Sequence, residues 1–359
     1  MIEYHNKGKN MILKNAKRVL SLLLLLQLFN LPISCKEEDK NSVNKPAPVA
    51  QFLNPLLSNG PDPWVIKKND IYYVTHTTGN GLKLYAASNM ANLPTAINKT
   101  VWTAPASGMN SRDIWAPEIH YINNAWYCYY AGDDGDNANH RMWVLENKSD
   151  DPLSGVWVDK GKLKLGDDKW AIDGTVFSQG DQLYIIWSGW ENEPYKSQEL
   201  YISRLSNPWT AEGERVQLSK PELPWERNGG DINEGPEILI RGDKIFLVYS
   251  ASACWTDDYT LGILSADVDS DLMNPASWTK YSQPVFTKNP EGQVFGPGHC
   301  SFFTDADGAD WILYHANPQT GQGCGGDRSV RMQPFTWKSD GMPDFGRPAS
   351  LNIKLNRPS

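Results

Sequence analysis

Residues 233–250 read NEGPEILIRGDKIFLVYS and contain two apolar runs that flank the turn residues Gly242 and Asp243. Glu234 and Glu237 stand at the start of the first run. Two apolar runs joined by a short turn that contains Gly and Asp are typical of a β-hairpin. We therefore predict a hairpin here, with carboxylates at the entrance of its first strand.

The same hairpin pattern recurs four more times along the chain. The matching stretches are 62–74 (DPWVIKKNDIYYV), 115–130 (WAPEIHYINNAWYCYY), 173–187 (DGTVFSQGDQLYIIW) and 299–314 (HCSFFTDADGADWILY). Spacings of 56, 55, 61 and 65 positions separate the leading polar residues Asp62, Glu118, Asp173, Glu234 and His299. A repeat of this length holds the roughly 40 to 50 residues of a four-stranded propeller blade plus its loops. The sequence predicts an all-β, five-bladed β-propeller that forms a single domain over residues 51–359.

The innermost strand of each blade lines the axis of a propeller, so the five hairpin entrances converge at one end of one channel. Four of the five leading residues are acidic. Carboxylates that are brought together raise one another's pKa, which is typical of functional sites. We predict that Asp62, Asp173 and Glu234 meet in an active site. Glu237 is the alternative to Glu234, because only one of the two can occupy the entrance of their strand.

Two tryptophans are candidates for substrate contacts. Aligning Ala116-Pro117-Glu118 with Gly235-Pro236-Glu237 sets Trp115 opposite Glu234, so Trp115 is predicted to face the pocket as an aromatic platform. Trp255 lies on a polar loop after the fourth hairpin and is a candidate for the pocket wall. Aromatic faces stack on sugar rings, but they also fill the cores of blades, and that is the alternative for both residues.

Two kinds of basic side chain accompany the fifth hairpin. Arg328 and Arg331 are three positions apart, and such residues point to opposite faces of a strand. Only one of them should therefore reach the site, and we predict Arg331. His299 follows Gly298 at the head of the hairpin, where an imidazole could bind a metal, orient a carboxylate or form a structural hydrogen bond.

Residues 1–35 precede the repeats and have the features of a secretory signal peptide. Basic residues up to Arg18 are followed by the apolar stretch 19–31 and then by Cys35. An apolar run of that length is too short to be retained as a membrane-spanning helix. We therefore predict that residues 1–35 are an export signal.

Cys35 ends the stretch Leu31-Pro32-Ile33-Ser34-Cys35, which resembles a bacterial lipobox, where the cysteine is acylated after cleavage. The charged residues 36–39 resemble a tag that directs lipoproteins to the cell surface. Residues 36–50 are predicted to be a polar tether. We expect an exported protein with an outer-membrane lipid anchor through Cys35. A plain signal peptide and a periplasmic location are the alternative.

Charge and cysteine content restrict the possible partners. The net charge of −8, with no run of Lys or Arg outside the N-terminal segment, argues against nucleic acid. No obligate protein partner is predicted. The absence of a C-x-x-C pair argues against a zinc site, and Cys128 and Cys300 lie in apolar strands as expected of buried thiols. Cys254 and Cys324 lie in loops, and the sequence leaves open whether they form a disulfide.

Taken in order, the motifs resemble glycoside hydrolase family 43, whose members are five-bladed propeller enzymes acting on arabinose- and xylose-containing polysaccharides. The resemblance rests on Gly60-Pro61-Asp62-Pro63, Trp115-Ala116-Pro117-Glu118, Ile172-Asp173-Gly174, Glu234-Gly235-Pro236, Gly298-His299 and Arg331-Met332-Gln333-Pro334-Phe335.

The resemblance implies an inverting mechanism in which Asp62 is the general base, Glu234 the general acid and Asp173 a third carboxylate that orients the acid and raises its pKa. The residues themselves fit this division. Inversion needs a carboxylate and a carboxylic acid on opposite faces of the sugar, and a like charge such as Asp173 helps to keep Glu234 protonated. The resemblance also implies a structural Ca²⁺ near His299.

The motif at residues 234–239 and the loop at 253–259 resemble those of exo-acting α-L-arabinofuranosidases, which would release arabinose from arabinan or arabinoxylan side chains. A β-xylosidase or an endo-arabinanase is the alternative within the family. A non-catalytic surface glycan-binding propeller is the alternative of another class. A protein that only binds glycans has no need to place three carboxylates together, which favours the enzyme.

Overall fold

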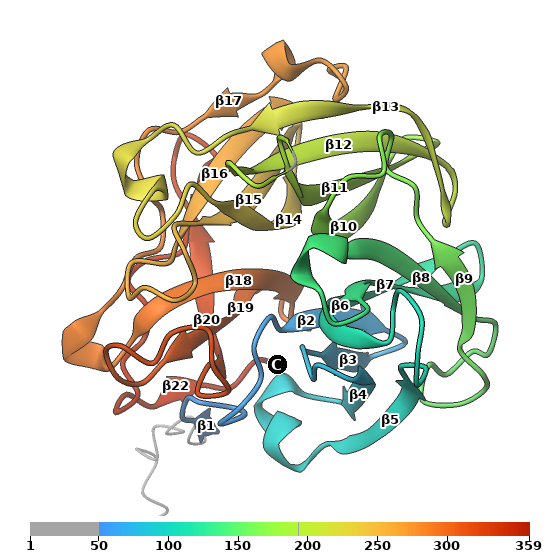
Figure 1. Ribbon diagram of the computed structural model, residues 1–359. Coiled ribbons are helices and arrows are strands. Elements are labelled where there is room, and N and C mark those ends of the chain that lie inside the picture. Colours follow the sequence, from blue (N-terminus) through green and yellow to red (C-terminus); the bar gives the residue numbers. More distant parts are fainter. Residues whose placement is uncertain (1–49, 193) are drawn as a thin grey trace, which may run out of the picture. The chain divides into compact units, whose positions relative to one another are not determined.

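The computed structural model describes residues 50–192 and 194–359. Five four-stranded antiparallel sheets follow one another along the chain and surround a common axis, as Figure 1 shows. The prediction of an all-β, five-bladed propeller is confirmed. The predicted signal peptide, the anchor at Cys35 and all but the last residue of the tether lie outside the described residues.

Each blade is a meander of consecutive strands, the first innermost. Blade I has β2 (Trp64–Lys68), β3 (Ile71–Thr75), β4 (Gly81–Ala87) and β5 (Ile97–Thr103). Blade II has β6 (Arg112–Ile122), β7 (Ala125–Asp133), β8 (Arg141–Asn147) and β9 (Val158–Lys162). Blade III has β10 (Ala171–Gln179), β11 (Gln182–Trp190), β12 (Gln198–Asn207) and β13 (Thr210–Ser219). Blade IV has β14 (Asn233–Arg241), β15 (Lys244–Ala251), β16 (Thr260–Asp267) and β17 (Thr279–Lys280). Blade V has β18 (Phe295–Thr304), β19 (Asp310–Asn317), β20 (Ser329–Trp337) and β21 (Pro343–Asp344).

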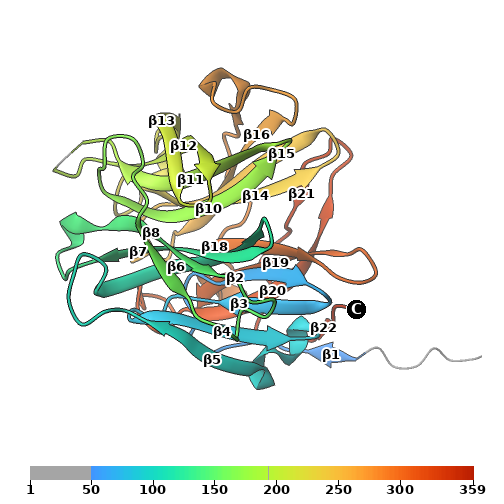
Figure 2. The ribbon, with the colours of Figure 1, turned by 90° about the vertical axis from the view of Figure 1, so that its right-hand side faces the viewer.

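Short elements complete the described chain. Five 3₁₀ helices lie in the connections: η1 (Met90–Thr95), η2 (Asn137–Asn139), η3 (Pro224–Glu226), η4 (Pro275–Ser277) and η5 (Pro290–Gly292). Strand β1 (Gln51–Phe52) pairs with β22 (Leu355–Asn356), so the two ends of the propeller lie side by side, as Figure 2 shows. Within the described residues, no helix is both long and apolar enough to cross a bilayer.

The predicted hairpins have their predicted turns. Asn69 and Asp70 connect β2 to β3 with φ of 51° and 59°, and Asn123 and Asn124 connect β6 to β7 with φ of 49° and 63°. Two consecutive residues with positive φ are the signature of the type I′ turn, whose twist matches that of the flanking strands. Asn and Asp tolerate this conformation better than most residues, so the turn residues fix the register of these inner hairpins.

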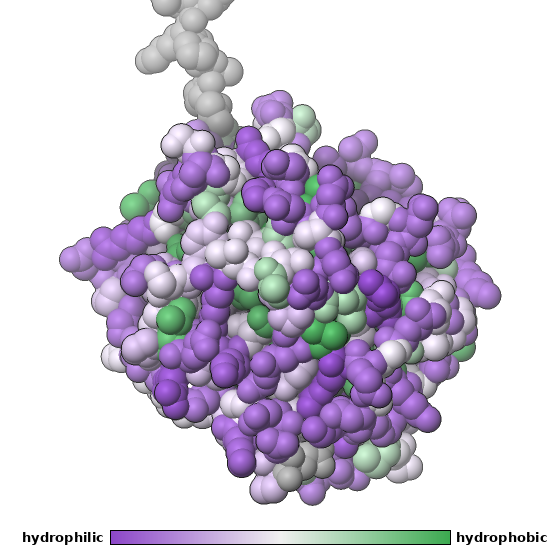
Figure 3. Space-filling model, turned by 90° about the horizontal axis from the view of Figure 1, so that it is seen from above, coloured by the Kyte–Doolittle hydropathy of each residue, from purple (hydrophilic) through white to green (hydrophobic). Residues whose placement is uncertain are grey.

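Apolar side chains fill the space between neighbouring blades. One cluster, which includes Tyr129 and Trp187, joins blades II and III. Another, which includes Val74 and Leu313, joins blade V to blade I and closes the ring. The chain before blade I also crosses this junction, because the backbone N–H of Leu56 donates to the carbonyl of Val330 at 2.8 Å. Burying these clusters removes apolar surface from water and thereby holds the blades around the axis. The outer face seen in Figure 3 is mostly hydrophilic, with hydrophobic residues in small scattered groups.

A backbone irregularity marks the entrance of every innermost strand. The residues with positive φ there are Asp62 (56°), Ala116 (41°), Asp173 (56°), Gly235 (52°) and His299 (46°). In blades II to V, the strand register shifts at this point, as expected of a β-bulge, which bends a strand and redirects its side chains. The equivalent positions therefore differ in part from the leading residues chosen by sequence spacing. In blade II the residue with positive φ is Ala116, whereas the spacing selects Glu118. In blade IV it is Gly235, whereas the spacing selects Glu234.

Candidate active site

The five strand entrances meet at a pocket of about 550 Å³. Each blade contributes a predicted site residue from the entrance of its innermost strand to the lining: Asp62, Trp115, Asp173, Glu234 and His299. The structure thus brings together the three acids that the sequence places 111 and 61 positions apart. The predicted alignment of Trp115 with Glu234 also holds, because each is the last paired residue before the bulge of its strand.

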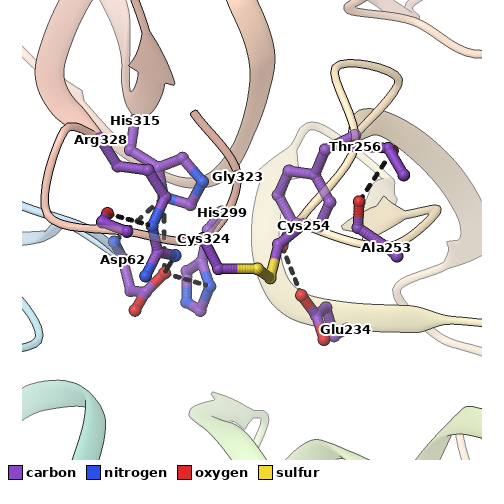
Figure 4. The surroundings of a disulfide bond; sticks show 12 residues. Asp62, Glu234, Ala253, Cys254, Thr256, His299, His315, Gly323, Cys324 and Arg328 are labelled. Carbon is purple, nitrogen blue, oxygen red and sulfur yellow. Dashed lines mark hydrogen bonds and ion pairs between the residues drawn. A yellow bond between two sulfur atoms is a disulfide. The ribbon is translucent and has the colours of Figure 1, made fainter. Parts of the chain in front are cut away.

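Asp62 accepts hydrogen bonds on both carboxylate oxygens. Arg328 Nη1 donates to Oδ1 at 2.9 Å, and Thr77 Oγ1 donates to Oδ2 at 2.7 Å. Burial alone would favour the neutral acid, but the Arg328 guanidinium and the hydrogen bond from the Thr77 hydroxyl hold the pKa of Asp62 well below its usual value. Figure 4 shows Arg328, His299 and His315 around this carboxylate. Asp62 is therefore an ionised acceptor, as a general base must be.

Glu234 is held from two sides. Tyr259 Oη donates to its Oε1 at 2.9 Å, and Gln198 Nε2 donates to its Oε2 at 2.9 Å. Burial raises the pKa of Glu234, while these two hydrogen bonds favour the carboxylate and limit the rise. A carboxyl group with a raised pKa can hold a proton near neutral pH, which is the requirement for a general acid.

Asp173 lies beside Glu234, and its Oδ2 accepts the backbone N–H of Gly235 at 3.0 Å. Burial raises the pKa of Asp173 well above its usual value, and the charges of Glu234 and then of Asp62 add to the effect. The two acids on blades III and IV therefore favour protonation, whereas Asp62 on blade I stays ionised. One pocket thus contains both a proton donor and a proton acceptor.

His299 lines the pocket, and its Nδ1 lies 3.3 Å from Asp62 Oδ1 and 4.0 Å from Asp173 Oδ2. Burial lowers its pKa, which favours the neutral imidazole. Among the described residues, no group of three or more His, Cys, Asp or Glu side chains is arranged to hold a metal ion. Ca²⁺ also accepts backbone carbonyls and waters as ligands, so the Ca²⁺ that the resemblance implies near His299 stays a prediction.

Aromatic side chains form much of the pocket wall. The Trp115 ring stacks on His140 with centroids 4.0 Å apart, and the rings of Trp170 and Trp190 stack on each other at 4.8 Å. Trp255 also lines the pocket and is 57% exposed, so its face is free to contact a ligand. Flat apolar faces of this kind suit the C–H faces of sugar rings.

Arg331 is not in the pocket, so its prediction as a site residue is wrong. Its side chain is fully buried and donates to Ser329 Oγ at 3.0 Å and to the carbonyl of Gln293 at 2.9 Å. The argument that only one arginine reaches the site is correct, but the arginine is Arg328. Strand β20 begins at Ser329, so Arg328 belongs to the preceding loop, and strand alternation does not set its direction.

Four other polar residues around the acids were not predicted: Thr77, Gln198, Tyr259 and His315. His315 accepts the backbone N–H of Asp62 on Nδ1 at 3.1 Å, which places its ring proton on Nε2. Its neutral state follows from burial, which lowers its pKa well below the usual value. These residues lie outside the repeated strand entrances, so the sequence repeat carries no signal for them.

Glu237, the predicted alternative to Glu234, lies further along β14 and accepts a hydrogen bond from Thr175 Oγ1 at 3.3 Å. Glu234 is among the described residues that line the pocket, and Glu237 is not. Glu118 occupies the equivalent position on β6 and contacts His120 Nε2 at 3.0 Å. Both glutamates follow the bulges of their strands and are buried in the propeller hub.

The two loop cysteines whose pairing the sequence leaves open form a disulfide, Cys254–Cys324, at the pocket rim. Cys128 and Cys300 are free and buried, as predicted. The disulfide joins the loop after β15 to the loop before β20, and so links blade IV to blade V.

Comparison with known proteins places this site in a family. The chain is 39% identical over 319 residues to a protein of Streptomyces avermitilis named extracellular exo-α-(1→5)-L-arabinofuranosidase, an alignment that covers 86% of this chain and 66% of that protein. It is 37% identical over 316 residues to α-L-arabinofuranosidase 43 of Humicola insolens, and this alignment covers 84% of this chain and 64% of that protein. The chain thus spans slightly less than two thirds of the length of these two relatives.

Structural comparison gives the same result. The crystal structure of the α-L-arabinofuranosidase from Lactobacillus brevis matches with a TM-score of 0.80 and 35% identity, over 84% of this chain and 98% of that chain. Residues 52–343, which run from before blade I to the first residue of β21 in blade V, match the family described as Glycosyl hydrolases family 43. The chain therefore belongs to glycosyl hydrolase family 43.

Proposed function

We propose that this chain is an inverting glycoside hydrolase, an exo-acting α-L-arabinofuranosidase that releases arabinose from arabinan or arabinoxylan side chains. One observation carries the proposal. A single pocket contains an ionised carboxylate, Asp62, and two buried acids with raised pKa values, Asp173 and Glu234. This is the division of protonation states that inverting hydrolysis requires.

In the proposed reaction, Asp62 accepts a proton from a water molecule as the water oxygen bonds to the anomeric carbon. Glu234 gives its proton to the glycosidic oxygen as the bond between that oxygen and the anomeric carbon breaks. Water attacks from the face opposite the leaving group, so the configuration at the anomeric carbon inverts. Asp173 assists by orienting Glu234, because its Oδ2 accepts the backbone N–H of the adjacent Gly235.

The aromatic walls support a sugar ligand. We propose that Trp115 and Trp255 contact the substrate, because both line the pocket and come from different blades. The stacking of His140 on one face of Trp115 holds that ring in place. The names of the Streptomyces avermitilis and Humicola insolens relatives favour arabinofuranose over xylose as the sugar.

The purified chain should be tested on an aryl α-L-arabinofuranoside, an aryl β-D-xyloside and linear arabinan. We expect hydrolysis of the arabinofuranoside, release of arabinose alone from arabinan, and the β-anomer as the first product in ¹H NMR. Release of xylose would favour a β-xylosidase, and release of arabino-oligosaccharides would favour an endo-arabinanase. An α-anomer as first product would contradict inversion, and binding without hydrolysis would favour a glycan-binding protein.

We also propose export and a lipid anchor at Cys35. The apolar segment and the lipobox-like stretch support this, and two Streptomyces relatives are named extracellular. Labelling cells with radioactive palmitate tests it directly. The full chain should incorporate label and sediment with membranes, and a Cys35→Ala variant should do neither. Label on the variant, or a soluble unlabelled full chain, would contradict the proposal.

A further inference from the structure

The Cys254–Cys324 disulfide crosses between two blades at the pocket rim, as Figure 4 shows. The two cysteines are 70 residues apart in sequence, and each lies in a loop that lines the pocket. The loop of blade V runs from the end of β19 at Asn317 to the start of β20 at Ser329. The disulfide therefore fixes the middle of this loop to blade IV.

A short chain of contacts leads from the disulfide to the proposed base. The carbonyl of Gly325, next to Cys324, accepts the Arg328 backbone N–H at 3.5 Å and its Nε at 3.3 Å. The same arginine donates through Nη1 to Asp62 at 2.9 Å. Its carbonyl accepts the backbone N–H of Gly60 at 2.9 Å, so the loop is bonded to the Asp62 segment twice.

Within blade V, the loop is held by Asn317 Nδ2, which donates to the carbonyl of Gly323 at 2.8 Å, and by the Gln319 N–H, which donates to Gln322 Oε1 at 2.9 Å. Four of its residues are glycines, at positions 321, 323, 325 and 326, and glycine loses more conformational entropy on ordering than any other residue. Asp257 of blade IV accepts hydrogen bonds from Thr320 and Gly321. In the described part of the chain, Gly321 is the last residue of this loop before Arg328 that is hydrogen-bonded to blade IV. Between Gly321 and Arg328, the disulfide at Cys324 connects the loop to that blade.

From this arrangement we propose that the Cys254–Cys324 disulfide is a positioning device for the reaction: it orders the glycine-rich loop so that Arg328 stays on the base Asp62. The proposal rests on the proposed function of Asp62. A cross-link reduces the number of conformations available to the loop. The ordered loop keeps Arg328 beside Asp62, and so the disulfide affects the step in which Asp62 takes a proton from water. The enzyme would thus reach full activity only in an oxidising compartment, where the bond persists.

The test compares the oxidised chain with the same chain treated with dithiothreitol. The two thiols of the reagent reduce the protein disulfide to two cysteine thiols and become a cyclic disulfide themselves. Cys128 and Cys300 are already free, so among the residues that the structure describes, reduction changes only the Cys254–Cys324 pair. A Cys254→Ser/Cys324→Ser variant should resemble the reduced chain and should not respond to the reagent.

Hydrogen exchange measured by mass spectrometry reports how well the backbone amides of the loop are protected, and it does not depend on activity. On reduction, we expect faster exchange in residues 318–328 and at the Gly60 amide, with no change in the β10–β11 hairpin of blade III. If only residues 318–328 exchange faster, or if nothing changes, the link to Asp62 is overturned.

Kinetics on the aryl arabinofuranoside then test whether the disulfide acts through Arg328. Reduction should lower kcat of the wild type by about tenfold, but it should change kcat of an Arg328→Ala variant less than about twofold, because coupled changes are not additive. Equal fold losses in both proteins, or no loss in the wild type, would overturn the proposal. An oxidised wild type that releases no sugar would instead contradict the proposed function, and the exchange at Gly60 would still decide the structural link.

Discussion

Nη1 of Arg328 lies 2.9 Å from Oδ1 of Asp62, although 266 residues separate the two in sequence. Both side chains are largely buried, with exposures of 13% and 10%, so solvent and salt screen their attraction only weakly. The pair joins blade V to blade I where the ring of blades closes. The ionisation of the proposed base thus depends on the closure of the propeller and on a loop residue.

Replacing Arg328 by Ala should raise the pKa of Asp62, because the carboxylate loses the charge that favours it. The acidic limb of the pH profile of kcat/KM should then move up by about 1 to 3 pH units, so that activity is lost at low pH first. Rates on an aryl arabinofuranoside between pH 3 and 9 measure the shift. Arg331→Met is the matched control. It should lower the melting temperature and leave the midpoint unchanged, since Arg331 is outside the pocket. An unmoved midpoint in Arg328→Ala would refute the assignment.

Asp62 and Glu234 should respond differently to the leaving group. Glu234→Gln removes the acid that protonates the departing oxygen, so hydrolysis of arabino-oligosaccharides should fall by about 10² to 10⁴-fold. Dinitrophenolate leaves without a proton, and kcat on dinitrophenyl arabinofuranoside should fall far less. Asp62→Asn should reduce both rates to a similar degree, because water must be activated in each case. Equal losses on both substrates for Glu234→Gln would contradict its role as the acid. Circular dichroism checks that both variants are folded.

Tyr259→Phe should change the other limb of the pH profile. Its hydroxyl donates to Glu234 and favours the carboxylate, so removing it should raise the pKa of Glu234. The enzyme should then keep the acid protonated to higher pH, and the basic limb of kcat should move up by about 1 pH unit. Tyr127→Phe provides the control, since that hydroxyl donates at the same distance to Glu146 in blade II. A basic limb that stays in place, or moves equally in both variants, would argue against the assignment.

The repeat predicted the blades and the three acids because both depend on local sequence. Asn123 and Asn124 form their turn wherever the hairpin lies, and Asp62, Asp173 and Glu234 stand at similar points of similar repeats. Arg328 reaches the pocket from a loop and Gln198 reaches it from the start of β12, while Tyr259 contacts Glu234 from a loop. Their side-chain directions depend on how blades and loops pack together, which no repeat in the sequence encodes.

The spacing of the sequence repeats does not predict which residues occupy equivalent positions at the strand entrances. Sequence spacing matched Glu118 with Asp62, whereas the backbone matches Ala116 with Asp62. A β-bulge changes the direction of the following side chains, so an acid two positions later points into the hub instead of the pocket. The local alignment with Gly235-Pro236-Glu237 was more informative than the period, because it matched the residues of the bulge itself.

The hub glutamates should make stability depend on pH. Burial raises the pKa of Glu118 well above its usual value, and the charge of Glu237 adds to this; burial also raises the pKa of Glu237. The neighbouring His120 stays neutral, because burial lowers its pKa to about 3. A carboxyl group whose pKa is higher in the folded than in the unfolded chain binds protons more tightly when folded. Its contribution to stability is therefore complete below the unfolded pKa and is lost as the pH rises through the folded pKa.

A Glu118→Gln/Glu237→Gln variant should lack this loss, because glutamine does not titrate. The free energy of unfolding in urea should fall more steeply from pH 5 to pH 8 in the wild type than in the variant, by roughly 1.4 kcal/mol per pH unit for each proton involved. The pocket acids titrate in both proteins, so the difference between the two curves isolates the hub pair. Glu291→Gln, at an exposed ion pair with Arg347, serves as a surface control. Parallel curves for wild type and double variant would mean that the hub glutamates are ionised in the folded protein, and their burial would then require a cation between them.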